Sequence, residues 1–232
     1  MLSKETYKKI LDSFAEQGKL FSNERQFQLE LAWTLKEMGH EVYLEVLEDK
    51  YKKTYIDLIV KETEYEYVAI ELKYTTMQSD RKRMDYHIGE KIVAVYSQGA
   101  GDVRRYDYLK DVQRIENLRE KTNVFGLANA CVTRGYAIIM TNDNYSGKSG
   151  EHTAYKQVAL NQGRKIPIEK ELTLKIKGYE NKTPIYLKGN YCCQWHSYNL
   201  SGAKITYETP KQGVKSVEYI KYPFEYMILE IK

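Results

Sequence analysis

The charged residues with the clearest chemical potential lie inside two short apolar segments of the sequence. Residues 55–60 contain Asp57, and residues 69–73 contain Glu71 and Lys73. An unpaired carboxylate or ammonium group is costly to bury, so a charge within an apolar strand generally has a partner or a functional role. Glu71 and Lys73 are two positions apart, so on a strand they project from the same face.

The polar residues 61–66 predict a hairpin that brings these charges together. With a hairpin centred near residue 64, Asp57 lies roughly opposite Glu71. Two carboxylates suit a hard divalent cation, Mg²⁺ or Mn²⁺, with the carbonyl of Leu72 as a further oxygen ligand. Such an ion would polarise a phosphodiester and lower the pKa of a bound water, while Lys73 orients that water or stabilises developing charge. The sequence indicates no other cofactor.

Helices and strands alternate around these residues. Apolar side chains at helical spacing predict helices over residues 6–17, from an N-cap at Ser22 to Gly39, and over residues 103–121. Segments rich in Tyr, Val, Ile and Leu predict strands. These segments are residues 41–47, 54–60, 67–74, 91–96, 136–141 and 224–231.

Asp57, a gap of thirteen residues, and then Glu71-Leu72-Lys73 resembles the motif of the PD-(D/E)xK nuclease superfamily, the restriction-endonuclease-like fold. The predicted order of helix, three strands, helix and strand over residues 22–142 resembles that family's αβββαβ core. The resemblance implies an α/β fold with a mixed sheet and hydrolysis of DNA phosphodiester bonds. Ile56 stands where the name of the motif has proline.

The same family places an acidic residue on the helix before the first core strand. Glu24 is the best match, because it shares the apolar stripe that begins with Phe27. Gln28 lies on nearly the same face, whereas Glu30 points away and is the second choice. The implied catalytic residues are Glu24, Asp57, Glu71 and Lys73, with Asp57, Glu71 and Leu72 on the metal.

Composition indicates a folded protein whose character changes after about residue 150. The 232 residues are 42% hydrophobic and 29% charged, with a formal net charge of +4. The last third, residues 151–232, holds all four prolines and carries 13 Lys and Arg against 8 Asp and Glu. We therefore expect an N-terminal helix (1–21), a nuclease-like core (22–150) and a β-rich, basic extension (151–232) packed on the core.

Clusters of basic residues are candidates for contacts with the phosphate backbone of a nucleic acid. They are Arg81, Lys82 and Arg83 in the polar stretch 75–86, and Arg104 and Arg105 at the start of the third helix. A solvated charged loop explains the first cluster equally well. DNA is the expected partner and RNA is left open. A homodimer is compatible with this interpretation, because cutting both strands of a duplex often uses two sites.

Other functional classes are less well supported by the sequence. The three cysteines form no C-x-x-C pair, and the four histidines have no zinc-site spacing. No signal-peptide segment and no membrane-length apolar run is present, so a cytoplasmic location is expected. The main alternative to a nuclease is a non-catalytic module on the same fold that binds nucleic acid or protein. In that case Asp57, Glu71 and Lys73 form a structural ion-pair cluster; a further alternative is an oligomeric interaction module.

Overall fold

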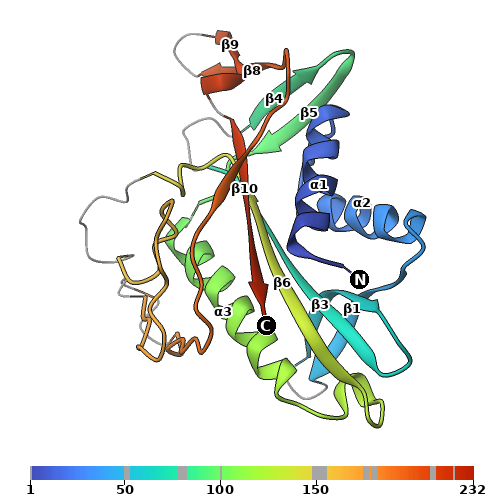
Figure 1. Cartoon of the computed structure of the whole chain (residues 1–232). Helices are drawn as coiled ribbons and strands as arrows, with labels where there is room; N and C mark the ends of the chain where they lie inside the picture. The colour runs from blue at the N-terminus through green and yellow to red at the C-terminus, as the bar shows by residue number, and fades with distance from the viewer. Residues whose placement is uncertain are drawn as a thin grey trace.

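The computed structural model describes residues 2–49, 53–77, 83–99, 101–147, 156–174, 178, 182–209, 213–221 and 223–232. The helices are α1 (Lys4–Glu16), α2 (Glu24–Glu37) and α3 (Gly101–Arg119), with short 3-10 turns at Val124–Gly126 and Tyr219–Lys221. The strands are β1 (Glu41–Asp49), β2 (Thr54–Lys61), β3 (Glu66–Thr75), β4 (Arg83–Ile88), β5 (Lys91–Tyr96), β6 (Cys131–Thr141), β7 (Trp195–Tyr198), β8 (Lys204–Thr209), β9 (Gly213–Glu218) and β10 (Phe224–Ile231). The protein is of the mixed α/β class (Figure 1).

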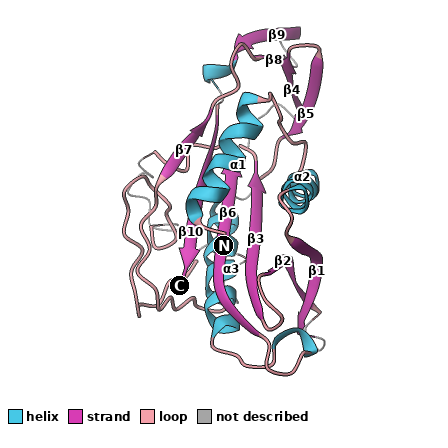
Figure 2. Ribbon diagram, turned by 45° about the vertical axis from the view of Figure 1, so that its right-hand side comes forward, coloured by secondary structure: helices cyan, strands magenta, loops and turns pink. Residues whose placement is uncertain are grey.

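Six strands form a mixed central sheet in the order β1-β2-β3-β6-β10-β7 (Figure 2). Strands β3 and β6 run parallel, and the other neighbouring strands pair antiparallel. Along β3, Val68 and Ile70 belong to one apolar cluster and Ala69 to the other, as the two-residue period of a strand requires. The sheet is therefore covered by apolar side chains on both faces, which is typical of α/β proteins.

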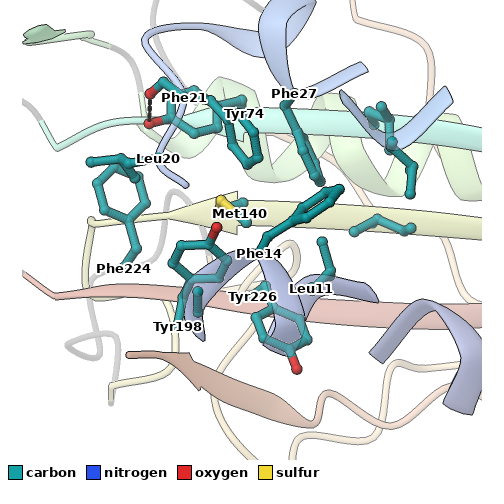
Figure 3. Packing of buried hydrophobic residues seen from close by; sticks show 14 of the residues in the cluster. Leu11, Phe14, Leu20, Phe21, Phe27, Tyr74, Met140, Tyr198, Phe224 and Tyr226 are labelled. Carbon is teal, nitrogen blue, oxygen red and sulfur yellow. Dashed lines mark hydrogen bonds between the residues drawn. The ribbon is translucent and has the colours of Figure 1, made fainter. Parts of the chain in front are cut away.

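Helices α1 and α2 cover one face of the sheet. Their buried aromatic and aliphatic side chains pack against Tyr74, Tyr198 and Phe224 (Figure 3). The side chain of Asn23 accepts a hydrogen bond from the Gln26 amide and caps α2. The prediction of Ser22 as the N-cap is therefore wrong by one residue. Asparagine is among the best N-cap residues, so α2 begins one position later than the sequence analysis placed it.

Helix α3 covers the other face of the sheet. It confirms the helix predicted over residues 103–121. Tyr108, Leu109, Val112 and Ile115 are all buried, with at most 1% of each residue exposed. The helix approaches β6 closely at Gly135, where an added Cβ would lie 2.1 Å from a methyl carbon of Ile115. Only a residue without a side chain allows this packing distance.

A second, antiparallel sheet has the strand order β5-β4-β8-β9 and lies at the upper end of the molecule in Figure 1. The polar stretch predicted over residues 75–86 ends within β4, whose alternation buries Met84 and Tyr86 and leaves Arg83 exposed. Only a few apolar residues alternate with polar ones here, and the flanking residues are polar. Such a pattern is a weak signal for a strand, which explains why β4 was not predicted.

The last third of the chain contributes to both sheets. Strands β7 and β10 belong to the central sheet, and β8 and β9 belong to the second sheet. Between residues 156 and 194, the described residues are mainly loops and turns, with isolated bridges at Lys165–Cys192 and Leu172–Ile185. Among the described helices, none has the length and apolar character needed to cross a lipid bilayer.

Candidate functional site

The site lies where β2 and β3 separate. Lys61 pairs with Tyr67 and Leu58 with Ile70, so the hairpin is centred on residue 64, as the sequence predicts. The backbone ladder ends at Leu58–Ile70, one position before Asp57. Beyond this point, β3 amides that face β2 must find other acceptors, because a buried N–H rarely remains unpaired.

Two carboxylates replace the missing ladder. Oδ2 of Asp57 accepts the N–H of Leu72 at 2.7 Å, and Oε2 of Glu24 accepts the N–H of Tyr74 at 2.7 Å. Glu24 comes from the first turn of α2, where a negative charge is favoured by the helix dipole. The prediction that Glu24 faces the core is confirmed. We call the place where β2 and β3 separate, at Asp57 and residues 71–74, the fork. It brings together one carboxylate from helix α2 and one from strand β2.

Burial is the main influence on both of these carboxyl groups. It raises the pKa of Glu24, although Lys73 and the Tyr74 amide act in the opposite direction. It also raises the pKa of Asp57, although the Leu72 amide and Lys73 act in the opposite direction. Both groups are therefore easier to protonate than an exposed carboxylate.

Gln28 and Glu45 support Asp57 from the side of α2 and β1. The side-chain amide of Gln28 donates to the carbonyl of Asp57 at 2.7 Å and to Oε1 of Glu45 at 3.0 Å. Arg25 also donates to Glu45, at 2.9 Å. Glu45 has φ of 50°, in the left-handed region, within an otherwise extended strand. A non-glycine residue costs about 1–3 kcal/mol in such a conformation, and such strain is concentrated at functional sites.

Lys73 forms an ion pair with α3 rather than with its strand neighbour Glu71. Its Nζ lies 3.3 Å from Oδ2 of Asp111. Burial alone would lower the pKa of Lys73, but the negative charges of Asp111, Glu24 and Asp57 raise it above the ordinary value. Lys73 is consequently a cation that is held among three carboxylates. Lys73 and Glu71 form no salt bridge with each other, although both lie on β3.

Glu71 is the most enclosed of the acidic residues, with a side chain only 2% exposed. Its Oε2 lies 2.6 Å from a guanidinium nitrogen of Arg114, and that nitrogen is also 3.0 Å from Oδ1 of Asp111. The other oxygen, Oε1, is buried and receives no hydrogen bond from the described residues. Burial, followed by the charges of Asp111 and Asp57, raises the pKa of Glu71 well above its ordinary value.

The cluster contains four acidic and two basic side chains. The acidic members are Glu24, Asp57, Glu71 and Asp111, and the basic members are Lys73 and Arg114. When all six are ionised, the cluster carries two excess negative charges. A buried group of like charges is unfavourable unless a counter-charge is added or protons bind. The arrangement therefore favours either protonation or a cation of charge +2.

Sequence reasoning missed Asp111 and Arg114. The signal that could have found them is their position on α3: each lies directly beside the buried stripe, next to Val112 or Ile115. The side chains of Asp111 and Arg114 are 14% and 26% exposed. They were overlooked because charged residues at the edge of the apolar face of a helix usually extend into solvent.

A groove of about 410 Å³ opens next to Asp111 and Arg114. Its wall is formed by α3 together with the end of β1 and the start of β2. The lining residues are Glu48, Thr54, Lys110, Asp111, Gln113, Arg114, Asn117 and Lys121. They are all polar, so the groove suits a hydrated, charged ligand better than an apolar one.

The predicted nucleic-acid-binding residues lie apart from the carboxylates. Arg81 and Lys82 fall outside the described residues. Arg83 forms an ion pair with Asp85 at 2.7 Å in β4. Arg104 donates to the carbonyl of Gly99, and Arg105 lies 3.8 Å from the ring centroid of Tyr145. Arg104 is seven residues from Asp111, about 10 Å along the helix axis.

Among the residues described here, no group of three or more His, Cys, Asp and Glu side chains is arranged to hold a metal ion. The carboxylates of the fork are instead joined to backbone amides and to basic side chains. Comparisons of the chain with protein-family models, with curated proteins and with solved structures gave no match. The chemistry of this site is therefore the basis on which a function can be proposed.

Proposed function

We propose that the protein is a divalent-metal-dependent nuclease that hydrolyses phosphodiester bonds, with DNA as substrate. The observation that carries the proposal is the buried Oε1 of Glu71, which receives no hydrogen bond from the part of the chain that the structure describes. Glu71 belongs to a cluster that has two excess negative charges when all its members are ionised. A carboxylate oxygen in this state is suited to a cation, and hard divalent cations prefer carboxylate oxygens.

The order of elements supports the same proposal. In the central sheet, β1, β2 and β3 form an antiparallel meander after α2, and α3 precedes β6, which lies parallel to β3. This order agrees with the restriction-endonuclease-like αβββαβ core that the sequence resembles. We therefore propose that residues 22–142 form such a core.

Asp57 and Glu71 would hold the metal ion, with the Leu72 carbonyl as a further oxygen ligand. When bound, the ion would supply polarisation of the phosphodiester and acidification of a water. Lys73 would orient the attacking water and stabilise the charge that develops on the phosphate. Glu24 would position β3 through its bond to the Tyr74 amide and act on the same water or metal. Asp111 keeps the Lys73 ammonium in place, so it acts as a positioning residue.

The test is calorimetric titration of Mg²⁺ or Mn²⁺ into the wild type, Asp57→Ala and Asp107→Ala. Asp107 pairs with Lys182, so its replacement is a matched control that also removes one carboxylate from an ion pair. We expect saturable binding in the wild type and the control, and its loss in Asp57→Ala. DNA cleavage should follow the same order. A wild type that neither binds metal nor cuts DNA contradicts the proposal.

One observation favours the alternative of a non-catalytic binding module. The Lys73–Asp111 and Arg114–Glu71 ion pairs partly neutralise the cluster without any metal. A module of this kind would bind nucleic acid with strong salt dependence and yield no metal-dependent product. Gel analysis of DNA incubated with Mg²⁺ or Mn²⁺ separates the two functions.

A further inference from the structure

Arg114 connects the carboxylate cluster with the adjacent groove. One guanidinium nitrogen serves both Glu71 and Asp111, at 2.6 and 3.0 Å. The Nε atom is buried and has no hydrogen-bond partner among the residues that the structure describes. The side chain is 26% exposed and lines the groove. Because a guanidinium has five N–H donors in a planar fork, Arg114 has bonding capacity that its two acidic partners do not use.

A metal ion at Glu71 would compete with this arrangement. Arg114 supplies the positive charge that Glu71 receives in the metal-free protein. A divalent cation on the same carboxylate supplies more charge and repels the guanidinium at short range. Arg114 would then be left with Asp111, which already pairs with Lys73. Its free donors need another anion.

The groove provides the place for that anion. Three of its lining residues are basic, namely Lys110, Arg114 and Lys121, and two are acidic, Glu48 and Asp111. Lys110 donates a hydrogen bond to the side-chain amide of Gln113, and Lys121 pairs with Glu48. Thr54 and Asn117 add uncharged polar groups. This lining matches the phosphate and sugar groups of a nucleic-acid backbone, which are bound by basic and neutral polar side chains without base readout.

We propose that Arg114 is a cation that changes partner: it holds Glu71 in the metal-free protein and binds a backbone phosphate in the groove once a divalent cation occupies the site. The inference rests on the proposed function. In this exchange of partners, the metal ion binds Glu71 and the nucleic-acid phosphate binds Arg114. Each ligand therefore favours the binding of the other. Such coupling is reciprocal by thermodynamic linkage.

The experiment compares the wild type with Arg114→Gln in two titrations. Mg²⁺ is first titrated into the DNA-free proteins by calorimetry. A labelled DNA duplex is then titrated by fluorescence anisotropy, in EDTA and in Ca²⁺, which shares the preference of Mg²⁺ for oxygen ligands. The anisotropy is recorded within the time over which electrophoresis shows intact DNA. Lys36→Gln, which removes an exposed charge from α2, is the matched control.

We expect Arg114→Gln to bind Mg²⁺ at least as tightly as the wild type, because the competing cation is gone. Its affinity for DNA should fall about tenfold in Ca²⁺, the effect of one charge-assisted hydrogen-bonded contact, and change little in EDTA. The slope of log K against log salt in Ca²⁺ should decrease by about one. Lys36→Gln should behave as the wild type.

Three results would overturn the inference. If the wild type binds Mg²⁺ and Arg114→Gln binds it more weakly, Arg114 only supports Glu71. An equal loss of DNA affinity in EDTA and in Ca²⁺ shows a phosphate contact that does not depend on metal. Unaltered DNA affinity in both conditions removes Arg114 from the interface. A wild type without metal binding refutes the proposed function itself, so the two failures are distinguishable.

A second variant covers the case in which Arg114→Gln does not fold, as judged by circular dichroism. Arg114→Lys keeps a positive charge beside Glu71, so its Mg²⁺ affinity should remain that of the wild type. Its DNA affinity in Ca²⁺ should fall several-fold, because an ammonium group cannot form the planar two-bond contact of a guanidinium. If Arg114→Lys binds DNA in Ca²⁺ as tightly as the wild type does, Arg114 does not move from Glu71 to a phosphate and the inference is wrong.

Discussion

Glu71 is expected to make the metal-free protein less stable as the pH rises. Burial, and then the charges of Asp111 and Asp57, raise the pKa of Glu71 well above its ordinary value. The unfolded chain releases this proton near its reference pKa of about 4.3. Between that value and the raised pKa, the folded state binds more protons than the unfolded state. The free energy of unfolding therefore contains a contribution from Glu71 that is complete below about pH 4 and is lost with rising pH.

The size of the effect follows from linkage. A difference of one bound proton changes the free energy of unfolding by about 1.4 kcal/mol per pH unit. Glu71→Gln keeps the shape of the side chain and removes the titration. Its stability should therefore decline less steeply than that of the wild type as the pH rises above about 5, by up to this slope. The slope is the quantity compared, because the substitution also removes the Arg114–Glu71 ion pair.

The assay is urea unfolding at a series of pH values in EDTA, followed by circular dichroism. Glu64→Gln, in the exposed turn between β2 and β3, is the matched control and should keep the wild-type slope. Identical slopes for the wild type and Glu71→Gln would refute the reasoning from burial and like charge. If Mg²⁺ binds the folded state as proposed, it should stabilise the wild type at neutral pH and leave Glu71→Gln nearly unaffected.

Three further substitutions test the packing that positions the site. Gly135→Ala places a methyl group against Ile115 and should cost about 1–3 kcal/mol of stability, measured by urea unfolding. Asn23→Ala removes the N-cap of α2 and should cost about 1 kcal/mol in the same assay, with weaker metal binding because Glu24 lies in the first turn. Glu116→Ala leaves three donors of residues 188–191 without their acceptor, and faster proteolysis of this segment is expected.

Much of the core could be predicted from the sequence because its signals are local. The stripe of α3 and the period of β3 are set by the spacing of apolar residues. The register of the β2–β3 hairpin follows from the length of its polar turn, so Asp57 and Glu71 could be placed together. The pairing of β4 with β8 and the membership of β10 in the central sheet depend instead on contacts between residues far apart in the chain. No local pattern contains that information.

The candidate site was predicted only in part for the same reason. Glu24 lies on α2, Asp57 on β2, and Glu71 and Lys73 on β3, all in the first third of the chain. The carboxylates of Glu24 and Asp57 accept hydrogen bonds from backbone amides of β3. The partners of Lys73 and Glu71 come from a helix about forty residues later, whose face is fixed by packing on β6. A charge beside a buried stripe can face solvent or the sheet, and the sequence does not distinguish these positions.

The energetics of the fork are those of a site for a ligand. In the metal-free protein, three carboxyl groups around Lys73 have raised pKa values because of burial: Glu24, Asp57 and Asp111. Glu45 holds a left-handed backbone conformation beside them. Each feature destabilises the folded state, and apolar residues of similar volume would remove the cost. A divalent cation opposes the excess negative charge directly. Under the proposed function, the same features that weaken the free protein would strengthen its binding of a metal ion, which is the relation expected when unfavourable polar groups are kept for function.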